Sequence, residues 1–209
     1  MSLINHHLNE TYHSRLGAYK ESMHVFIQQG LRRFLESNNK RSISILEVGY
    51  GTGLNAILSC EEAIIHQLSI RYEAIEKYPV PSDLLHGLSY ADLSLENKEV
   101  VQLIHSANWE SEVEICTHFS LFKRQSDILK TALNHAYDII YFDAFAPSKQ
   151  ADLWHFDVLQ KLVRSLKKNG LLVSYSAMGQ FKRDLKSLGL IVTNPPGALG
   201  KREMTVACK

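Results

Sequence analysis

The chain has 209 residues, of which 45% are hydrophobic and 22% are charged. This composition is that of an ordinary globular domain, so it excludes a largely disordered chain, and the length predicts one domain with its own core. No apolar run approaches the ~18 residues of a membrane span, and the polar N-terminus lacks the apolar segment of a signal peptide. Lys and Arg number 23 against 22 Asp and Glu, and this net charge of +1 neither requires nor excludes a nucleic-acid partner.

Cysteine and histidine usage bears on compartment and metals. Cys60, Cys116 and Cys208 are far apart and form no C-x-x-C pair, which is typical of a reducing compartment, so we expect a cytoplasmic protein without disulfides. His6 and His7 are adjacent and therefore point apart, and no H-x3-H or H-E-x-x-H spacing occurs. We therefore predict no metal site.

Apolar periodicity alternates between helix and strand along most of the chain. In chain order we predict a helix over about residues 21–36, a strand at 43–48, a helix at 54–66, strands at 70–75, 113–119 and 137–142, a helix at 153–166 stopped by Asn169-Gly170, a strand at 171–175, a helix at 181–188, and strands at 190–193 and 203–208. Strands separated by helices predict an α/β fold with a mostly parallel, doubly wound sheet.

The end of the chain departs from this alternation. About ten residues, including Asn194-Pro195-Pro196-Gly197, join the last two strands, which is too short for a helical crossover and predicts an antiparallel final strand. A parallel sheet closed in this way resembles the Rossmann-like methyltransferases. We expect residues 1–41 to form a cover segment packed on the core, and residues 42–209 to form the methyltransferase domain.

A glycine cluster follows the first predicted strand and opens the next helix. Gly49, Gly51 and Gly53 have the spacing G-x-G-x-G, so the third glycine comes one residue earlier than in the dinucleotide motif G-x-G-x-x-G. Structural glycines at a strand-to-helix turn would look similar, but Glu47 precedes this loop. An acid there disfavours a pyrophosphate and suits a cationic sulfonium with an amino-acid tail, which favours S-adenosylmethionine over NAD.

Two acids follow the next strands of the predicted sheet. Glu76 ends the second strand, where a carboxylate can accept both ribose hydroxyls of a nucleoside; the alternative is a surface acid paired with Lys77. Asp127 follows the third strand, where such folds present an acid to an adenine amino group, and the alternative is an Asp that caps a helix.

Asp143 ends the fourth strand and opens the run Asp143-Ala144-Phe145-Ala146-Pro147. An acid followed by an aromatic residue and a proline resembles the (D/N)-P-P-(Y/F) element of amino-group methyltransferases. Methyl transfer requires an aligned neutral amine and exclusion of water. We predict that Asp143 holds the amine and receives its proton, and that Phe145 stacks on a flat base. The alternative is a helix-capping Asp143 and a core Phe145.

Several motifs appear together in an order that resembles one family. They are Gly51-Thr52-Gly53-Leu54-Asn55, Glu76-Lys77-Tyr78-Pro79, Phe142-Asp143-Ala144-Phe145-Ala146-Pro147-Ser148-Lys149 with Leu153-Trp154, and Gly200-Lys201-Arg202-Glu203-Met204. Together they resemble the methyltransferase domain of the bifunctional MnmC-type tRNA modification enzymes and their stand-alone MnmD-type relatives, from about residue 11 to the C-terminus.

The resemblance implies S-adenosylmethionine-dependent methylation of the 5-aminomethyl group of a (2-thio)uridine at the tRNA wobble position. It implies cofactor contacts by Glu47, Gly49, Gly51, Gly53, Asn55, Glu76, Lys77, Asp127 and Asp143, and substrate contacts by Phe145, Pro147, Lys149, Lys201 and Arg202. Lys201 and Arg202 would help to hold the anticodon stem-loop or the flipped base. The sequence shows no second glycine fingerprint of the FAD-dependent half of the bifunctional enzymes, so we expect either another route to the aminomethyl group or a separate oxidase that supplies it.

Other readings stay open on the sequence alone. A methyltransferase or aminopropyltransferase-like enzyme acting on a small-molecule amine would use the same glycine loop. A catalytically silent methyltransferase fold could serve as an RNA-binding module, although the complete acidic set of Glu47, Glu76 and Asp143 argues against it. A dehydrogenase is disfavoured because position 54 is Leu rather than Gly.

Overall fold

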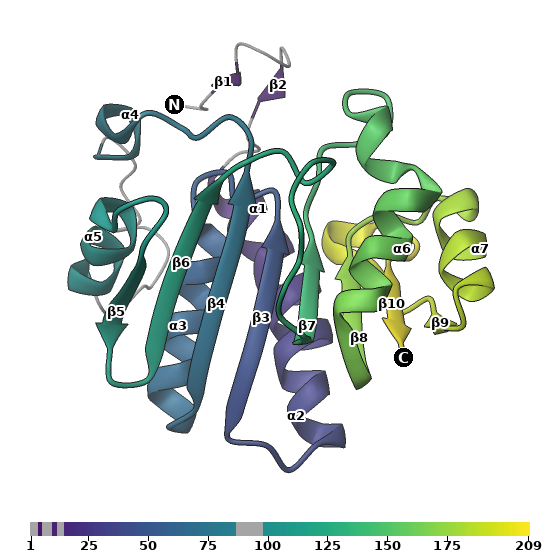
Figure 1. The fold of residues 1–209 in the computed structure, drawn as a ribbon, viewed down its shortest axis with the longest axis horizontal. Helices are drawn as coiled ribbons and strands as arrows, with labels where there is room; N and C mark the ends of the chain where they lie inside the picture. The colour runs from purple at the N-terminus through teal and green to yellow at the C-terminus, as the bar shows by residue number, and fades with distance from the viewer. Residues whose placement is uncertain (1–3, 6–9, 12–14, 87–97) are drawn as a thin grey trace.

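A mixed β-sheet of eight strands forms the centre of the molecule, in the order β5-β6-β4-β3-β7-β8-β10-β9 (Figure 1). The computed structural model describes residues 4–5, 10–11, 15–86 and 98–209. The strands are β3 (Ser42–Val48), β4 (Ser69–Glu76), β5 (Glu112–Cys116), β6 (Phe119–Gln125), β7 (Tyr137–Phe142), β8 (Leu166–Ser174), β9 (Ile191–Thr193) and β10 (Thr205–Cys208), and β1 (Ile4–Asn5) pairs separately with β2 (Glu10–Thr11). Neighbours among β6, β4, β3, β7 and β8 are parallel, whereas β10 is antiparallel to both β8 and β9.

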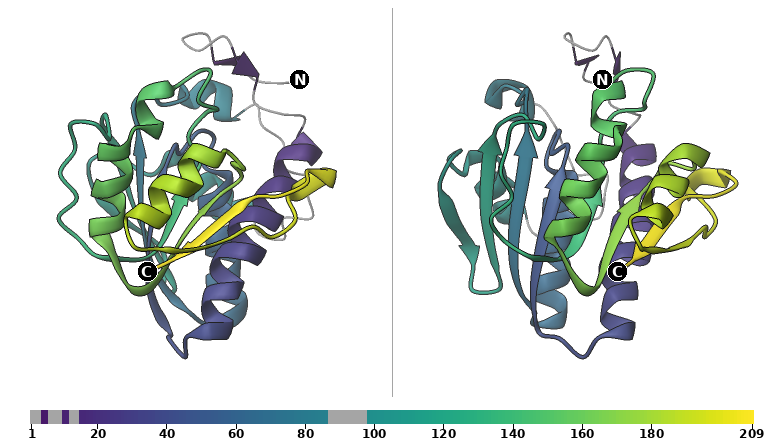
Figure 2. Two further views of the ribbon diagram at one scale, coloured as in Figure 1. Left: turned by 90° about the vertical axis from the view of Figure 1, so that its right-hand side faces the viewer. Right: turned by 45° about the vertical axis from the view of Figure 1, so that its right-hand side comes forward.

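Helices cover both faces of this sheet (Figure 2). One face carries a helical run made of α1 (Arg15–Ser22), the π-helical stretch η1 (Met23–Arg32) and α2 (Arg33–Ser37), together with α3 (Leu54–His66) and α5 (Lys98–Ser106). The other carries α6 (Phe156–Ser165) and α7 (Gly179–Ser187). The short elements are α4 (Ser82–His86) and the 3-10 turns η3 (Ala151–Trp154) and η4 (Ala198–Gly200).

Two hydrophobic cores result from the alternation of side chains along the strands. Ile45 and Ile139 face the core beneath η1 and α3, whereas Leu46 and Ile140 face the core beneath α6 and α7. The central strands are therefore apolar on both faces, which explains why they appear in the sequence as short continuous apolar runs. The doubly wound α/β fold with an antiparallel final strand is confirmed.

The prediction of one strand at 113–119 is wrong. The structure has two strands there, β5 and β6, which form an antiparallel hairpin, and β6 is the strand that lies parallel to β4. The turn lies at Thr117-His118, where no Gly or Pro marks it, so the apolar alternation runs on from one strand into the next.

The role predicted for Asn169-Gly170 is also wrong. Helix α6 ends at Ser165, four residues earlier, and β8 begins at once. Asn169 has a positive φ of 62° and its amide donates to the carbonyl of Lys209 at 2.8 Å, while the pairing register of β8 with β7 shifts nearby. The pair therefore forms a bulge inside a strand rather than a helix C-terminus.

The helical run before the sheet begins at Arg15, earlier than the predicted residue 21. Phe26 and Leu31 of η1 are buried in the core, and the Phe26 ring lies 5.1 Å from that of Tyr141 in β7. Residues 1–3, 6–9 and 12–14 of the predicted cover segment lie outside the described residues. The division into a cover at 1–41 and a domain at 42–209 stays a prediction.

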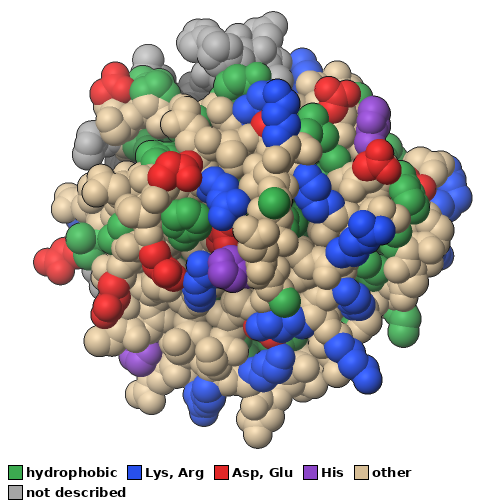
Figure 3. Space-filling view, in the orientation of Figure 1, with side chains coloured by type: hydrophobic (Ala, Val, Ile, Leu, Met, Phe, Trp, Pro, Cys, Tyr) green, Lys and Arg blue, Asp and Glu red, His purple; other side chains and the backbone are tan. Residues whose placement is uncertain are grey.

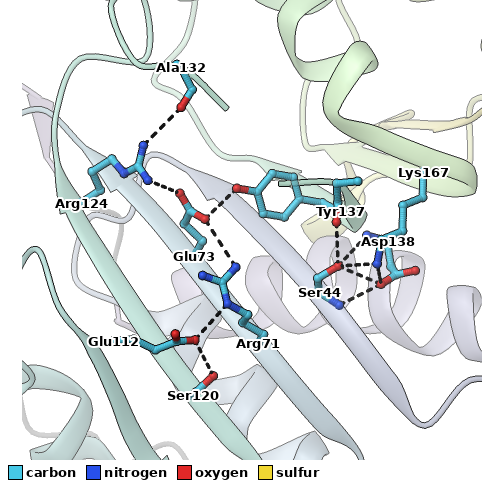
Figure 4. A network of polar contacts seen from close by, with 11 residues as sticks. Ser44, Arg71, Glu73, Glu112, Ser120, Arg124, Ala132, Tyr137, Asp138 and Lys167 are labelled. Carbon is cyan, nitrogen blue, oxygen red and sulfur yellow. Dashed lines mark hydrogen bonds and ion pairs between the residues drawn. The ribbon is translucent and has the colours of Figure 1, made fainter. Parts of the chain in front are cut away.

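Two buried acids within the strands, away from the cavity, are paired with cations and hydroxyls (Figure 4). Glu73 in β4 accepts a hydrogen bond from the Tyr137 hydroxyl at 2.7 Å and pairs with Arg124 at 3.1 Å. Asp138 in β7 is 2.8 Å from Lys167 and accepts from the Ser44 amide. Burial raises the pKa of Asp138, but its cationic and hydrogen-bonding partners outweigh burial and lower the pKa to about 2. These groups are structural and lie away from the strand ends that form the site.

Candidate active site at the carboxyl ends of the strands

A cavity of about 720 Å³ lies where the carboxyl ends of β3, β4, β6 and β7 meet. Its walls come from the loops that follow these strands, from α1 and from the loop before β10. Ligands of doubly wound sheets bind at this edge, and the volume is that of a typical small-molecule site. Of the predicted site residues, Gly49, Gly51, Asn55, Glu76, Lys77, Asp127, Asp143, Phe145, Lys149 and Lys201 line the cavity. Glu47, Gly53, Pro147 and Arg202 are not among its lining residues.

The glycine loop after β3 is held between the two neighbouring strands. Gly49, Gly51 and Gly53 all have positive φ, at 94°, 52° and 79°. A Cβ on Gly49 would lie only 2.5 Å from the carbonyl oxygen of Asp143, while the Gly49 amide donates to Ile75 at 3.0 Å. Only glycine combines this backbone conformation with this close approach. The loop thus forms the cavity floor between β4 and β7.

Glu76 points from the end of β4 toward the glycine loop. Its carboxylate accepts hydrogen bonds from the Gly51 amide at 3.2 Å and from the Tyr78 amide at 2.9 Å. Burial raises its pKa, and the backbone donors oppose that rise. The alternative of a surface acid paired with Lys77 is excluded, because Lys77 pairs with Asp127 instead, at 2.9 Å.

Asp127 lines the cavity and also stabilises the turn that follows β6. One carboxylate oxygen accepts from the Leu129 amide at 3.0 Å and so caps the turn after β6. The other oxygen binds Lys77. Burial raises the pKa of Asp127, but the hydrogen bond from Lys77 and the backbone donor outweigh it, so the pKa is lowered. Asp127 therefore caps a turn and not the helix of the alternative interpretation, and it also lines the cavity.

A buried chain of polar side chains supports the floor of the cavity. The Tyr72 hydroxyl donates to Glu47 at 2.9 Å, and the Asn55 amide nitrogen donates to Glu47 at 2.7 Å and to Asp143 at 2.9 Å. Glu47 is fully buried and does not reach the cavity. Asn55 contacts Glu47 and lines the cavity, so it links the two. The chain fixes the position of the Asp143 carboxylate, which excludes the alternative of a helix-capping Asp143.

Burial and neighbouring charge shift the pKa values of Glu47 and Asp143, the two acids of this hydrogen-bonded network. Burial raises the pKa of Glu47 well above its ordinary value, and the nearby Asp143 raises it further. Burial likewise raises the pKa of Asp143 to about 7, with Asn55 opposing the rise. The oxygen atom of the Asn55 amide is buried and has no hydrogen-bond partner among the described residues. The floor therefore offers an acceptor and a carboxyl group that titrates near neutrality.

The loop after Asp143 forms the wall beside this carboxyl group. Phe145 is half-buried and lines the cavity. Its amide donates to the Gln150 side chain at 3.1 Å, and its carbonyl accepts from the Trp154 indole at 2.9 Å. Trp154 is in turn packed against Phe142 and buried. Phe145 is thus held at the cavity surface rather than in the core.

At the rim opposite the glycine loop, helix α1 near the N-terminus meets the loop that precedes β10. Lys201, before β10, forms an ion pair with Glu21 of α1 at 2.5 Å and lies 5.5 Å from the centre of the Tyr175 ring. The Tyr175 hydroxyl donates to the carbonyl of Ala144 at 2.9 Å. Sequence reasoning missed Glu21 and Tyr175. Tyr175 directly follows β8, so the strand-end rule that selected Asp143 would also have found it.

Neither a metal-binding cluster nor a membrane-spanning helix is found among the described residues. Within residues 15–86 and 98–209, no three His, Cys, Asp or Glu side chains come together in a way that could hold a metal ion. No helix in the described part of the chain is both long and apolar enough to cross a membrane.

Comparison with known proteins decides the family. The model of a family described as S-adenosyl-L-methionine-dependent methyltransferase matches residues 98–209, which is more than half of the chain. The chain belongs to this methyltransferase family. The predicted family and its cofactor, S-adenosylmethionine, are thereby confirmed.

Curated relatives of this methyltransferase include the proteins named tRNA 5-methylaminomethyl-2-thiouridine biosynthesis bifunctional protein MnmC. The one from Leptospira interrogans is 28% identical and matches 97% of the chain, and the one from Burkholderia multivorans is 27% identical and matches 98%. The methyltransferase chain spans about a third of the length of each, 33% in both cases.

Solved structures give the same picture. The crystal structure of MNMC2 from Aquifex aeolicus aligns with 99% of this methyltransferase and 65% of its own chain, at 26% identity and a TM-score of 0.71. The N-methyltransferase NodS from Bradyrhizobium japonicum, at 14% identity and a TM-score of 0.51, shares the fold. The predicted resemblance to MnmC-type methyltransferase domains is confirmed.

Proposed function

We propose that this methyltransferase transfers a methyl group from S-adenosylmethionine to the 5-aminomethyl group of a (2-thio)uridine at the wobble position of tRNA. The observation that carries the proposal is the Asp143 carboxyl group on the cavity floor, with a pKa of about 7, beside the half-buried ring of Phe145. The names of the MnmC relatives, which give 5-methylaminomethyl-2-thiouridine, support the choice of substrate.

The residues of the cavity fit the cofactor. The unpartnered oxygen of Asn55 suits a donor such as an amino-acid ammonium group. Glu76 is half-buried at the end of β4, where ribose hydroxyls bind in this fold class, and each of its oxygens retains capacity to accept. The cluster of Glu47, Glu76 and Asp143 favours a bound cation. We therefore assign cofactor contacts to the glycine loop, Asn55 and Glu76, with Lys77 and Asp127 at the outer wall, and Glu47 as a support for Asn55.

The substrate side of the site requires a neutral amine and a flat surface. S-Adenosylmethionine supplies an electrophilic methyl group on a positively charged sulfur. Asp143 in its carboxylate form accepts a hydrogen bond from the amine nitrogen, which orients the lone pair, and takes up the proton that this nitrogen loses once it is methylated. Phe145 offers a ring on which a pyrimidine base can stack. Asn55 and Glu47 keep the Asp143 carboxylate in place.

Nucleoside mass spectrometry tests the proposal. tRNA that carries 5-aminomethyl-2-thiouridine is incubated with the enzyme and labelled S-adenosylmethionine, and label is expected in 5-methylaminomethyl-2-thiouridine alone. Asp143→Asn should abolish labelling and still bind S-adenosylhomocysteine in calorimetry. Asp157→Asn, at an exposed position in α6 outside the cavity, is the matched control and should retain activity.

The competing functions give different results in the same assay. Labelling of a free nucleoside or a polyamine without tRNA would identify a small-molecule amine methyltransferase. Binding of tRNA and S-adenosylhomocysteine without any transfer would identify a silent RNA-binding module. Either outcome refutes the proposed substrate. Full turnover by Asp143→Asn refutes only the proposed role of this residue.

A further inference from the structure

The nearly neutral net charge hides a strong asymmetry along the chain. Residues 161–209 contain ten Lys and Arg and only two Asp and Glu, whereas residues 1–160 contain thirteen Lys and Arg and twenty Asp and Glu. Such asymmetry within one domain is typical of proteins that bind a polyanion through one part of their surface.

The fold gathers this basic stretch on one side of the molecule. Residues 161–209 form the end of α6, all of β8 and α7, and the last two strands, which lie together on one half of the sheet. The space-filling view shows Lys and Arg side chains on the right-hand part of the surface, where α6, α7 and β8 lie in the ribbon view, and further ones over its centre and lower part (Figure 3). Helices α6 and α7 pack against one another and so present a joint surface.

Some of these cations have structural tasks that explain them. The ammonium group of Lys161 donates to three carbonyls of the turn after β6, and Lys167 pairs with the buried Asp138. Lys182 pairs with Glu203 at 2.9 Å, and Lys209 donates to carbonyls at the end of α6. These four residues are accounted for by the fold.

A second group of cations has no such task. Arg164 on α6, Lys168 on β8, Lys186 on α7 and Arg202 before β10 are exposed, and none forms an ion pair with a carboxylate of the described residues. We call these four residues the basic face. Arg164 and Lys186 lie in the last turns of their helices, where a cation interacts favourably with the helix dipole. That effect does not explain Lys168 or Arg202, which lie outside helices.

The basic face begins beside the cavity and ends at the opposite edge of the sheet. Arg202 directly follows Lys201, whose ammonium group lies at the cavity rim. The Lys182–Glu203 ion pair joins the same loop to α7, and α7 packs on α6, which is about 15 Å long. Arg202 therefore lies beside the cavity, whereas Arg164 and Lys168 lie where α6 ends and β8 begins, at the edge of the sheet opposite the cavity.

We propose that the basic face binds the phosphate backbone of the RNA stem that carries the target base, while the base itself lies in the cavity. The proposal rests on the proposed function and adds the surface that holds the rest of the substrate. Phosphate contacts fix the register of a nucleic acid without reading its sequence, so exposed cations that form no ion pair with the described carboxylates suit the task. Lys201 is engaged by Glu21 and Tyr175, so it shapes the rim rather than serving as a free phosphate contact.

Salt-dependent binding of an anticodon stem-loop RNA tests the proposal. We compare the wild type with the triple variant Arg164→Ala, Lys168→Ala, Lys186→Ala by fluorescence anisotropy at several salt concentrations. Each phosphate contact contributes about 0.7–0.9 to the slope of log affinity against log salt, so the triple variant should lose about 2 from that slope. Its affinity at low salt should fall at least tenfold. The affinity for S-adenosylhomocysteine should be unchanged.

The matched control removes a cation elsewhere. Lys98 is exposed at the start of α5, which packs beside β5 at the edge of the sheet remote from α6, α7 and β8. The variant Lys98→Ala, which removes one exposed cation there, should keep the wild-type slope within about 0.5. Thermal unfolding of both variants separates a binding effect from the small loss expected where a helix loses a C-terminal cation.

The outcomes separate this proposal from the proposed function. If the wild type binds the stem-loop and the triple variant keeps its slope and affinity, the basic face is refuted whether or not methyl transfer occurs. If methyl transfer to the aminomethyl nucleoside is absent while the triple variant still loses RNA affinity, the basic face stands and the proposed reaction fails. If the triple variant instead loses an acidic protein partner and keeps RNA binding, the surface belongs to a protein interface and the proposal is overturned.

Discussion

Replacing Asp143 by Asn should make the stability of the protein much less dependent on pH. Burial raises the pKa of Asp143 from 3.8 to about 7. A carboxyl group with a higher pKa in the folded state binds more protons there than in the unfolded chain, so the free energy of unfolding falls as the pH rises from about 4 to about 7. Above pH 7 the contribution is constant.

The size of the effect follows from that window. Each pH unit contributes at most about 1.4 kcal/mol, so between pH 5 and pH 7 the wild type should lose roughly 2–3 kcal/mol relative to Asp143→Asn. Glu47 also has a raised pKa, and because Asp143 contributes to that rise, the difference between the two proteins reports Asp143 together with its coupling to Glu47. The Asn side chain can still accept the hydrogen bond from Asn55, which keeps the two structures comparable.

Urea unfolding of the ligand-free proteins at pH 5, 6, 7 and 8 measures this difference. The two curves of unfolding free energy against pH should converge toward acid pH and diverge toward neutral pH, with Asp143→Asn the more stable protein at pH 7. Asp157→Asn, at an exposed position, should follow the wild type throughout. Parallel curves for the wild type and Asp143→Asn would refute the claim that the buried carboxyl group carries the perturbed pKa.

Three further predictions concern the cofactor and the fold. Gly49→Ala should weaken S-adenosylhomocysteine binding at least tenfold in calorimetry, because the added Cβ would meet the Asp143 carbonyl. The control is Gly189→Ala, since Gly189 also has a positive φ, +90°, but a Cβ there would have nothing within 4 Å. This control should leave the affinity unchanged. Glu76→Gln should raise the dissociation constant of the same ligand by about 10–100-fold, since it removes a charged acceptor. Lys123→Met should cost about 1–3 kcal/mol in urea unfolding, because two buried carbonyls at the end of α5 lose their donor, and an unchanged midpoint would contradict this.

Much of the fold could be predicted because local signals agreed with the tertiary structure. Helix α3 and strand β7 have the predicted bounds, since each combines clear apolar spacing with a glycine loop or an acid at its end. The β5–β6 hairpin could not be found, because Thr117-His118 carries no turn signal. The bulge at Asn169 was misread because Asn-Gly suits both a helix end and a left-handed bulge residue, and only the bond to Lys209 decides between them.

The site was predictable as far as strand ends define it. The glycine loop, Glu76 and Asp143 follow directly from the rule that ligands bind at the carboxyl ends of parallel strands. Tyr72 and Glu21 were missed because their importance lies in contacts with residues far away in the chain, Glu47 and Lys201. A single sequence contains no signal for such pairs.

The ion pair between Glu21 and Lys201 has a consequence for synthesis of the protein. The two residues are 180 positions apart, and β10, which follows Lys201, lies between β8 and β9. During translation at about 5–20 residues per second, the glycine loop and Glu76 emerge many seconds before the residues that close the opposite rim. The nascent chain therefore carries most of the proposed cofactor contacts before its pocket is closed, so we expect methyl-donor binding only after the Lys201 loop and β10 have been added.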